Sequence, residues 1–216
     1  MSGIVGSRLN IRGSGLVGSL GTDGQIFTSS GAGAGAVFED AAGGGAWNLL
    51  STTTASNDAT IDIETNDLDS TYTNYAVVFS DVQPSSDNQT TCVQLSVGGT
   101  YATSGYQFCT RGTRSDGVAS NDVSESAAHM LLTGLGVGSA TGEVTHGVLY
   151  IFNPSGTTYT KFIRATSCQI GATAGRVILT SVAGSNMTQT AVDGIRFFPR
   201  DDGDVATGTF KLYGIS

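Results

Sequence analysis

Charged residues are scarce in this chain of 216 residues. Asp, Glu, Lys and Arg make up 13% of it, whereas an average soluble domain carries roughly 25%. The few charges are mostly acidic, with 18 Asp and Glu against 10 Lys and Arg, so the net charge is -8. Such a chain repels the phosphates of nucleic acids, and we expect no nucleic-acid partner.

Cysteine and histidine are also rare. Cys92, Cys109 and Cys168 are odd in number and show no C-x-x-C spacing. Each lies in an apolar or alternating run, which predicts buried free thiols, with a Cys92–Cys109 disulfide as the alternative. His129 and His146 have neither H-x-H nor H-E-x-x-H spacing. We therefore expect both to be structural or exposed, and we expect no metal site.

Long apolar runs are absent. The first twenty residues contain no apolar core between a basic start and a cleavage site, as a secretory signal would require. No window approaches the roughly 18 apolar residues of a membrane-spanning helix. We expect a protein that is made in a cytoplasm and does not insert into a membrane.

The motifs of common enzymes are missing or out of context. The run GSGLVG at residues 13–18 matches G-x-G-x-x-G, but the residues that follow break a helix, so nucleotide binding is not expected. Neither a G-x-x-x-x-G-K-[ST] loop nor a G-x-S-x-G elbow occurs. Asp201, Asp202 and Asp204 surround a glycine without EF-hand spacing, which predicts a solvated turn rather than a calcium loop. Asp67 and Asp69 receive the same interpretation. We expect no catalysis and no cofactor.

Glycine is abundant, with 31 residues, and it is concentrated in the N-terminal stretch. Glycine is costly to order, yet isolated apolar residues punctuate this stretch, and a solvated linker would gain nothing from them. Residues 1–45 are therefore predicted to form an extended docking arm, with short strands at Gln25–Ser29 and Ala36–Glu39. The two arginines of this arm are suited to bind an acidic protein surface. The predicted docking residues are Ile4, Arg8, Leu9, Ile11, Arg12, Leu16, Val17, Leu20, Ile26 and Phe27.

Residues 46–216 show short alternating or β-branched runs separated by Gly, Ser and Asn turns. This pattern predicts about ten strands and an all-β domain, with a jelly-roll-like antiparallel β-sandwich as the preferred fold. Cys92–Val97 and Tyr101–Thr110 are expected to form a hairpin around Gly98-Gly99. Ala127–Leu135 is the one segment where a helical turn is an alternative to a strand.

The polar run from Arg111 to Ser126 is predicted to be the longest loop, and long loops often bind partners. Its candidate receptor-facing residues are Arg111, Arg114, Asp116, Asn121 and Asp122. Aromatic residues are candidates for stacking on sugars, although most lie at predicted strand ends, where aromatic rings often only close a core. These residues are Trp47, Tyr72, Tyr101, Tyr106 and Tyr159.

The N-terminal segment GSLGTDGQIFTSSGAGAGAVFE resembles a Gly-rich segment, G-T-D-G-Q-V-L-T-S-x-G-A-G, of tail-fibre and other virion appendage proteins of tailed bacteriophages. The body, from Trp47-Asn-Leu-Leu to Phe210-Lys-Leu-Tyr-Gly214, looks like small β domains of phage structural proteins. The chain has no long shaft, no G-X-Y repeat and no heptad run. The matching positions are Gly21, Thr22, Asp23, Gly24, Gln25, Thr28, Ser29, Gly31, Ala32 and Gly33.

This resemblance implies a non-enzymatic virion structural protein, assembled in the cytoplasm of the host bacterium. The family suggests a homotrimer whose residues 1–45 dock onto other virion proteins while residues 46–216 are displayed for host attachment. The receptor would be a bacterial surface glycan or protein. Two alternatives stay open: a capsid decoration or cement protein, and a glycan-binding or depolymerising tail protein.

Overall fold

The computed structural model describes residues 25–29, 36–40, 46–63, 68–172, 175–201 and 203–216. The chain divides into two compact units, Met1–Ala46 and Trp47–Ser216. We describe each unit by itself.

The described part of the first unit is a two-stranded antiparallel hairpin. Strand β1 (Gln25–Ser29) pairs with β2 (Ala36–Asp40), with Phe27 opposite Phe38 in the register. Both strands coincide closely with the short strands predicted for this segment. Two of the predicted docking residues, Ile26 and Phe27, lie on β1. The others, from Ile4 to Leu20, lie outside the described residues.

The second unit contains the strands β3 to β16 and, among its described residues, no helix. The prediction of an all-β antiparallel sandwich is confirmed. The strand bounds are β3 (Trp47–Asp58), β4 (Ile61–Ile63), β5 (Asn74–Pro84), β6 (Thr91–Val97), β7 (Thr100–Tyr101), β8 (Tyr106–Arg114), β9 (Ala119–Ser120), β10 (Val123–Ala127), β11 (Met130–Leu131), β12 (Thr145–Phe152), β13 (Phe162–Ile170), β14 (Val177–Ser185), β15 (Gly194–Pro199) and β16 (Val205–Ile215).

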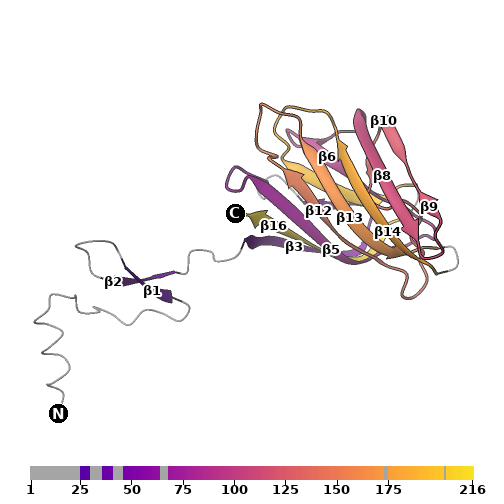
Figure 1. The fold of residues 1–216 in the computed structure, drawn as a ribbon, viewed down its shortest axis with the longest axis horizontal. Coiled ribbons are helices and arrows are strands. Elements are labelled where there is room, and N and C mark those ends of the chain that lie inside the picture. Colours follow the sequence, from indigo (N-terminus) through magenta and orange to yellow (C-terminus); the bar gives the residue numbers. More distant parts are fainter. Residues whose placement is uncertain (1–24, 30–35, 41–45, 64–67, 173–174, 202) are drawn as a thin grey trace, which may run out of the picture. The chain divides into compact units, whose positions relative to one another are not determined.

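A large nine-stranded sheet forms one layer. Its strands follow the order β10-β8-β14-β13-β12-β5-β16-β3, with β9 paired to β8, and every pairing is antiparallel. Figure 1 shows β12, β13, β14, β8 and β10 side by side. The last strand of the body, β16, lies beside its first strand, β3, and Ile215 near the C-terminus pairs with Trp47.

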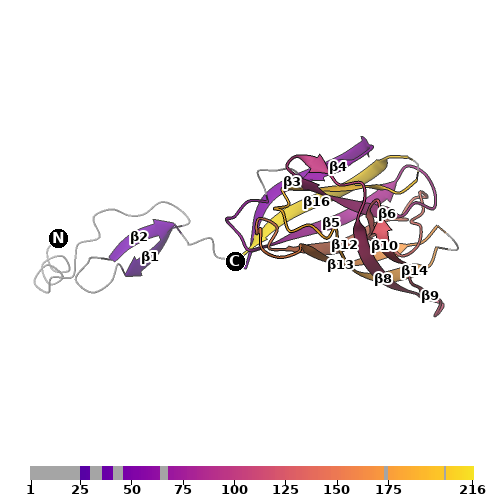
Figure 2. The ribbon, with the colours of Figure 1, turned by 90° about the horizontal axis from the view of Figure 1, so that it is seen from above.

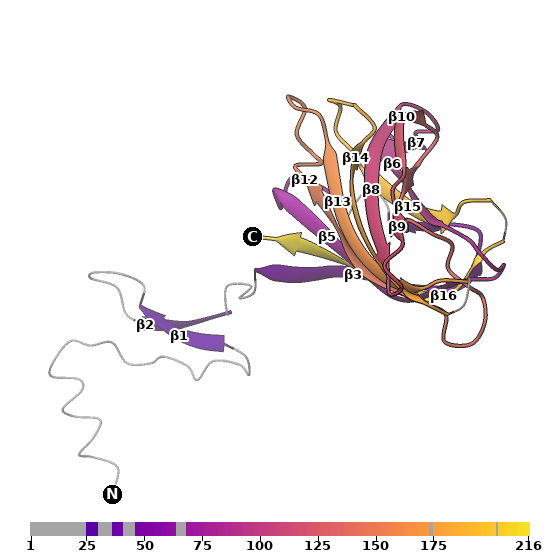
Figure 3. The same cartoon turned by 45° about the vertical axis from the view of Figure 1, so that its right-hand side comes forward.

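A smaller five-stranded sheet forms the other layer. Its order is β11-β6-β15-β4, with β7 paired to β6, again in antiparallel fashion. Figure 3 shows β6, β7 and β15 lying together behind β8 and β10 of the large sheet, as expected for two facing sheets. Figure 2 shows the same strands from above.

The core lies between the two sheets. It holds large aromatic side chains from both layers, since Phe79 of β5 and Phe210 of β16 contact Phe197 of β15 at ring-centroid distances of 6.3 and 5.0 Å. A hydrogen bond also links the layers: the Leu95 N–H of β6 donates to the hydroxyl of Tyr106 on β8, at 2.7 Å. Burial raises the pKa of Tyr106 to about 12.

The expected hairpin around Gly98-Gly99 is correct only at its turn. Both glycines have positive φ, 60° and 76°, as a tight two-residue hairpin requires. However, only the short strand β7 returns beside β6. The chain then crosses to the large sheet, where β8 pairs with β14 and β10. The predicted partner, Tyr101–Thr110, was therefore wrong for most of its length.

One further expectation needs correction. The predicted long loop from Arg111 to Ser126 consists mostly of the end of β8, the short β9 and most of β10. Its polar composition fits these strands because they lie at one edge of the large sheet, where side chains face water. The segment Ala127–Leu135 contains β11 and no helical turn.

Candidate binding face on the large sheet

The face of the large sheet turned away from the core carries an unusual amount of exposed apolar surface. Burial alternates along β13 and along β14 as far as Gly184, so that Ile163, Ala165 and Val182 enter the core while their neighbours point outward. We call this outward side the outer face. The large apolar side chains exposed on it or at its rim include Trp47, Leu49, Val123, Phe152, Phe162, Val177, Leu179 and Met187.

An open groove of about 610 Å³ crosses the outer face near β10, and we call it the apolar groove. Val123 and Phe162, which are 78% and 54% exposed, form part of its walls. Glu125 is its single acidic lining residue. The full lining is Gln107, Phe108, Cys109, Val123, Ser124, Glu125, Phe162, Ala183, Gly184, Ser185 and Met187.

A second groove of about 430 Å³ adjoins the first, and we call it the arginine groove. The two share Cys109, Val123 and Ala183, so they form one continuous depression. Arg111 comes from β8 and Arg164 from β13, on either side of β14. The lining residues are Cys109, Thr110, Arg111, Asn121, Val123, Arg164, Ser181, Val182 and Ala183.

Four of the eight Lys and Arg residues in the described part of the body are paired with acids. Arg114 and Arg176 both contact the carboxylate of Asp116, and Arg200 contacts Asp201 at 3.3 Å. Arg196 pairs with Asp62 through two hydrogen bonds of 2.7 Å each. The buried Lys161 donates to the backbone carbonyls of Tyr159 and Gln189. By contrast, Arg111, Arg164 and Lys211 form no ion pair with any described residue.

An aromatic cluster covers another part of the outer face. The Trp47 ring lies 5.9 Å from that of Tyr150 and 5.5 Å from that of Tyr213. Tyr150 also stacks on Phe152 at 6.5 Å. The cluster approaches the arginine groove, because Tyr150 is the cross-strand neighbour of Arg164. Aromatic rings, guanidinium groups and hydroxyls therefore share one surface.

The structure separates the five predicted receptor-facing residues into two groups. Arg111 and Asn121 line the arginine groove together. Arg114 and Asp116 instead pair with each other, and the Arg114 guanidinium lowers the pKa of Asp116 to about 2. Asp122 joins β8 through its backbone, since its carbonyl accepts the Thr110 N–H at 2.8 Å.

The five aromatic residues that the sequence offered as candidates for sugar stacking lie in different parts of the body and do not form one site. Tyr106 is fully buried. The Arg196 guanidinium carbon lies over the ring of Tyr101, 4.0 Å from the ring centroid. Tyr72 packs on Tyr75. Trp47 belongs to the aromatic cluster, whereas Tyr159 is 73% exposed in the segment between β12 and β13.

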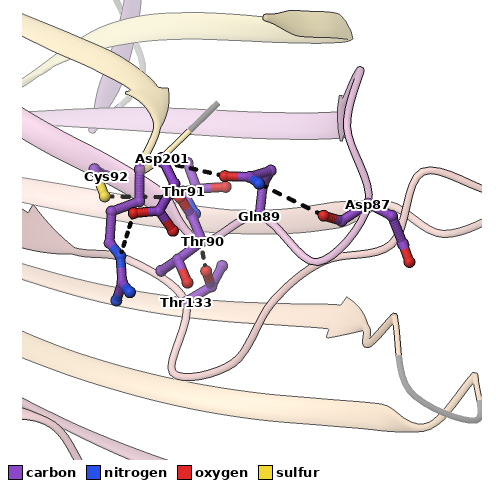
Figure 4. Close-up of polar contacts among 8 residues, drawn as sticks. Asp87, Gln89, Thr90, Thr91, Cys92, Thr133 and Asp201 are labelled. Atoms are coloured by element: carbon purple, nitrogen blue, oxygen red, sulfur yellow. Dashed lines mark hydrogen bonds and ion pairs between the residues drawn. The ribbon is translucent and has the colours of Figure 1, made fainter. Parts of the chain in front are cut away.

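The turn at Asp201 is held by local protein contacts (Figure 4). The Asp201 carboxylate accepts a hydrogen bond from the Arg200 guanidinium. The backbone N–H of Asp201 donates to the side-chain oxygen of Gln89 at 3.2 Å. The Asp204 N–H donates to Ser85 Oγ. In the described residues no three His, Cys, Asp or Glu side chains gather as a metal site would require. Asp67 and Asp202 lie outside those residues.

The cysteine prediction was partly wrong. All three cysteines are free thiols, but only Cys92 is buried, while Cys109 and Cys168 are exposed on the outer face. Alternation decides this outcome, because both lie at outward positions of their strands. His129 packs edge-to-face on Phe198, and His146 Nδ1 accepts the Asp81 N–H at 3.2 Å.

Sequence reasoning did not single out Arg164, Ser181, Tyr150 or Phe162. The period-two alternation of FIRATSCQI was visible and places Arg164 on the outward side of β13. What the sequence did not reveal was that β14 lies between Arg164 of β13 and Arg111 of β8, because β14 pairs with β8, which is far from it in the chain.

Comparison of the chain with known protein families, curated proteins and solved structures returns no match. Within the described residues no helix is long and apolar enough to cross a membrane. The case for a function therefore rests on the chemistry of the outer face and on the resemblance of the Gly-rich segment.

Proposed function

We propose that the protein is a non-enzymatic structural protein of a bacteriophage particle that attaches to the host surface. In this proposal, residues 1–45 dock the chain onto other virion proteins, and the β-sandwich presents the outer face of its large sheet to a bacterial glycan or protein. Assembly takes place in the host cytoplasm, and the displayed unit is a homotrimer.

The observation that carries the proposal is the continuous depression formed by the apolar and arginine grooves. A solvated structural face is dominated by polar, mutually neutralised side chains, whereas this one combines open apolar surface with arginines that have no described acidic partner. Such combinations are typical of binding surfaces. The Gly-rich segment 18–39, with its resemblance to phage appendages, supports the virion setting.

A second candidate is a capsid decoration or cement protein. The aromatic cluster around Trp47 favours it, because exposed aromatic rings are frequent anchors between protein subunits. In that case the cluster would meet neighbouring capsid subunits, and the grooves would have no receptor. A depolymerising tail protein is the third candidate, and it requires hydrolysis of a host polysaccharide.

The number of copies of this chain in each purified particle separates these candidates. Quantitative mass spectrometry against the major capsid protein should find a few to a few dozen copies for an attachment appendage. Hundreds of copies would instead establish a decoration protein, and absence from the particle would contradict the virion proposal altogether.

Deletion of residues 2–40 tests the docking role. We expect the remaining chain to be soluble and folded, as judged by circular dichroism, but absent from particles produced in its presence. Incorporation at the level of the full chain would contradict docking through the N-terminal unit.

A further inference from the structure

We propose that the arginine groove binds the acidic sugar of an anionic polysaccharide, with Arg111 and Arg164 holding its carboxylate or phosphate. The inference deepens the proposed function, because it names the class of receptor that the outer face recognises.

The two arginines are placed to act on one ligand. Arg164 pairs with Ala183 of β14, and Arg111 pairs with Ser181 of the same strand. Their backbones are thus two strand spacings apart across the sheet and offset by two residues along it, a separation of about 12 Å, and both side chains line the same groove. Arginine side chains are long enough to converge over β14, and their planar guanidinium groups match the geometry of carboxylate and phosphate.

The floor of the groove leaves room for a ligand. Between the two arginines, β14 presents only the small side chains Ser181 and Ala183. The Ser181 hydroxyl and the Asn121 amide add uncharged hydrogen-bonding groups that suit sugar hydroxyls. A volume of about 430 Å³ lies within the range typical of small-ligand sites.

The neighbouring surface suits a sugar chain. Phe162 lies in the adjoining apolar groove, and Tyr150 is the cross-strand neighbour of Arg164. An aromatic ring provides an apolar face with a polar edge, on which the C–H face of a sugar ring can pack. A glycan chain that crosses the depression would thus meet ionic, hydroxyl and apolar surface in succession.

A peptide is less well suited to this site. Extended peptides commonly bind by adding a strand to a sheet edge. Here the floor is β14, whose backbone is already paired with β13 on one side and β8 on the other. A ligand in the arginine groove therefore meets side chains and no free strand edge.

The charge balance argues for a sparsely charged polymer. The body from Trp47 to Ser216 holds 8 Lys and Arg against 15 Asp and Glu, a net charge of -7. Nucleic acid carries one charge per about 1.7 Å of duplex and would be repelled along its length. A polysaccharide with one acidic sugar in each repeat places its charge at the two arginines and neutral sugars elsewhere.

The exposed cysteines provide an internal test in the full-length protein. Cys109 lines the arginine groove, whereas Cys168 lies on the same face, four residues beyond Arg164 along β13 and thus about 13 Å away. The rate of alkylation by iodoacetamide at each cysteine is measured by mass spectrometry, with and without glycan. The probes are a polyuronate, its methyl ester and a phosphodiester-linked teichoic-acid polymer.

We expect an acidic polymer to slow alkylation of Cys109 at least about fivefold and to leave Cys168 unchanged. The methyl ester should give no protection, and protection by either the polyuronate or the teichoic acid identifies the acid. Arg111→Gln and Arg164→Gln should each weaken binding about tenfold, as expected for loss of a charged hydrogen bond. Lys211→Gln is the matched control, because it removes a cation from β16 on the same sheet.

Several results would overturn the proposal: equal protection by the methyl ester, no protection by either acidic polymer, wild-type binding by the two arginine variants, or protection only by a polyglutamate peptide. These assays use the purified chain and therefore do not depend on particle incorporation. If the chain is absent from particles yet Cys109 is protected, the virion proposal fails and the site stands.

Discussion

The outward-facing arginines of the two sheets differ in the contacts that they make within the protein. On the small sheet, Arg196 forms two 2.7 Å hydrogen bonds with Asp62 on the adjacent strand and lies against the Tyr101 ring. On the large sheet, Arg111 and Arg164 face a groove floored by small residues and have no acidic partner among the described residues.

The difference separates structural from functional charge. An arginine that is held by a carboxylate and a ring has its hydrogen bonds satisfied within the fold, so it contributes to stability. An arginine over an open groove contributes little to the fold and remains available to a ligand. The comparison predicts that changes on the small sheet affect the free energy of unfolding, while changes in the groove affect binding.

The largest effect is expected at the link that both sheets share. Tyr106→Phe removes the hydroxyl that accepts the buried Leu95 N–H, which should lower the free energy of unfolding by about 1–3 kcal/mol. Urea denaturation measures this change. Tyr159→Phe, at a tyrosine that is 73% exposed, is the control and should change nothing. Equal stability of the two variants would contradict the role of Tyr106.

A smaller loss is expected on the small sheet. Asp62→Ala removes the two hydrogen bonds that Asp62 makes with Arg196 and should cost about 1 kcal/mol, because the two side chains are partly exposed. Asp201→Ala makes a matched control, since the Arg200–Asp201 pair is more exposed, and its effect should stay below about 0.5 kcal/mol. Urea denaturation again measures the free energy of unfolding. A larger loss for Asp201→Ala than for Asp62→Ala would contradict the structural role of the Arg196–Asp62 pair.

Changes in the groove should barely affect stability. Arg111→Gln and Arg164→Gln remove exposed cations that have no ion pair in the described structure. Each should alter the free energy of unfolding by less than about 0.5 kcal/mol. A loss above about 1 kcal/mol for either variant would mean that these arginines are structural after all.

The smallest effect concerns pH. Burial, together with the positive charge of Arg200, lowers the pKa of His129 below its ordinary value. The unfolded chain then binds the proton more readily than the folded one, so the His129 contribution is present above the ordinary pKa and is lost as pH falls through it. Unfolding measured between pH 7.5 and 5 should show a weaker pH dependence in His129→Gln. An identical dependence in the two proteins would contradict this.

Much of the fold could be predicted from local pattern. The alternating runs in β13 and β14 identify strands because one face of each enters the core. The runs in β5 and β12 identify strands because they are rich in β-branched and aromatic residues. The strand β3 was predicted only at its start, because its continuation from Ser51 is rich in Ser and Thr and mostly exposed at the sheet edge. The crossing from β7 to β8 depends on how the two sheets pack, which local pattern does not contain.

The candidate site was predicted only in part. Arg111 and Asn121 were identified within a polar run, although that run was taken for a loop. Arg164 and Ser181 belong to strands whose partners are set by nonlocal pairing and register. Alternation shows which way each residue points, but it does not show which residues become neighbours.

The most direct test compares Arg164→Gln with Arg196→Gln in binding to an acidic polysaccharide, at a temperature where both variants are folded. One variant changes an arginine in the open groove, and the other changes an arginine held by Asp62 and Tyr101. We predict that Arg164→Gln binds about tenfold more weakly and that Arg196→Gln binds like the wild type. Equal affinities, or a loss confined to Arg196→Gln, would contradict the assignment of binding to the large sheet.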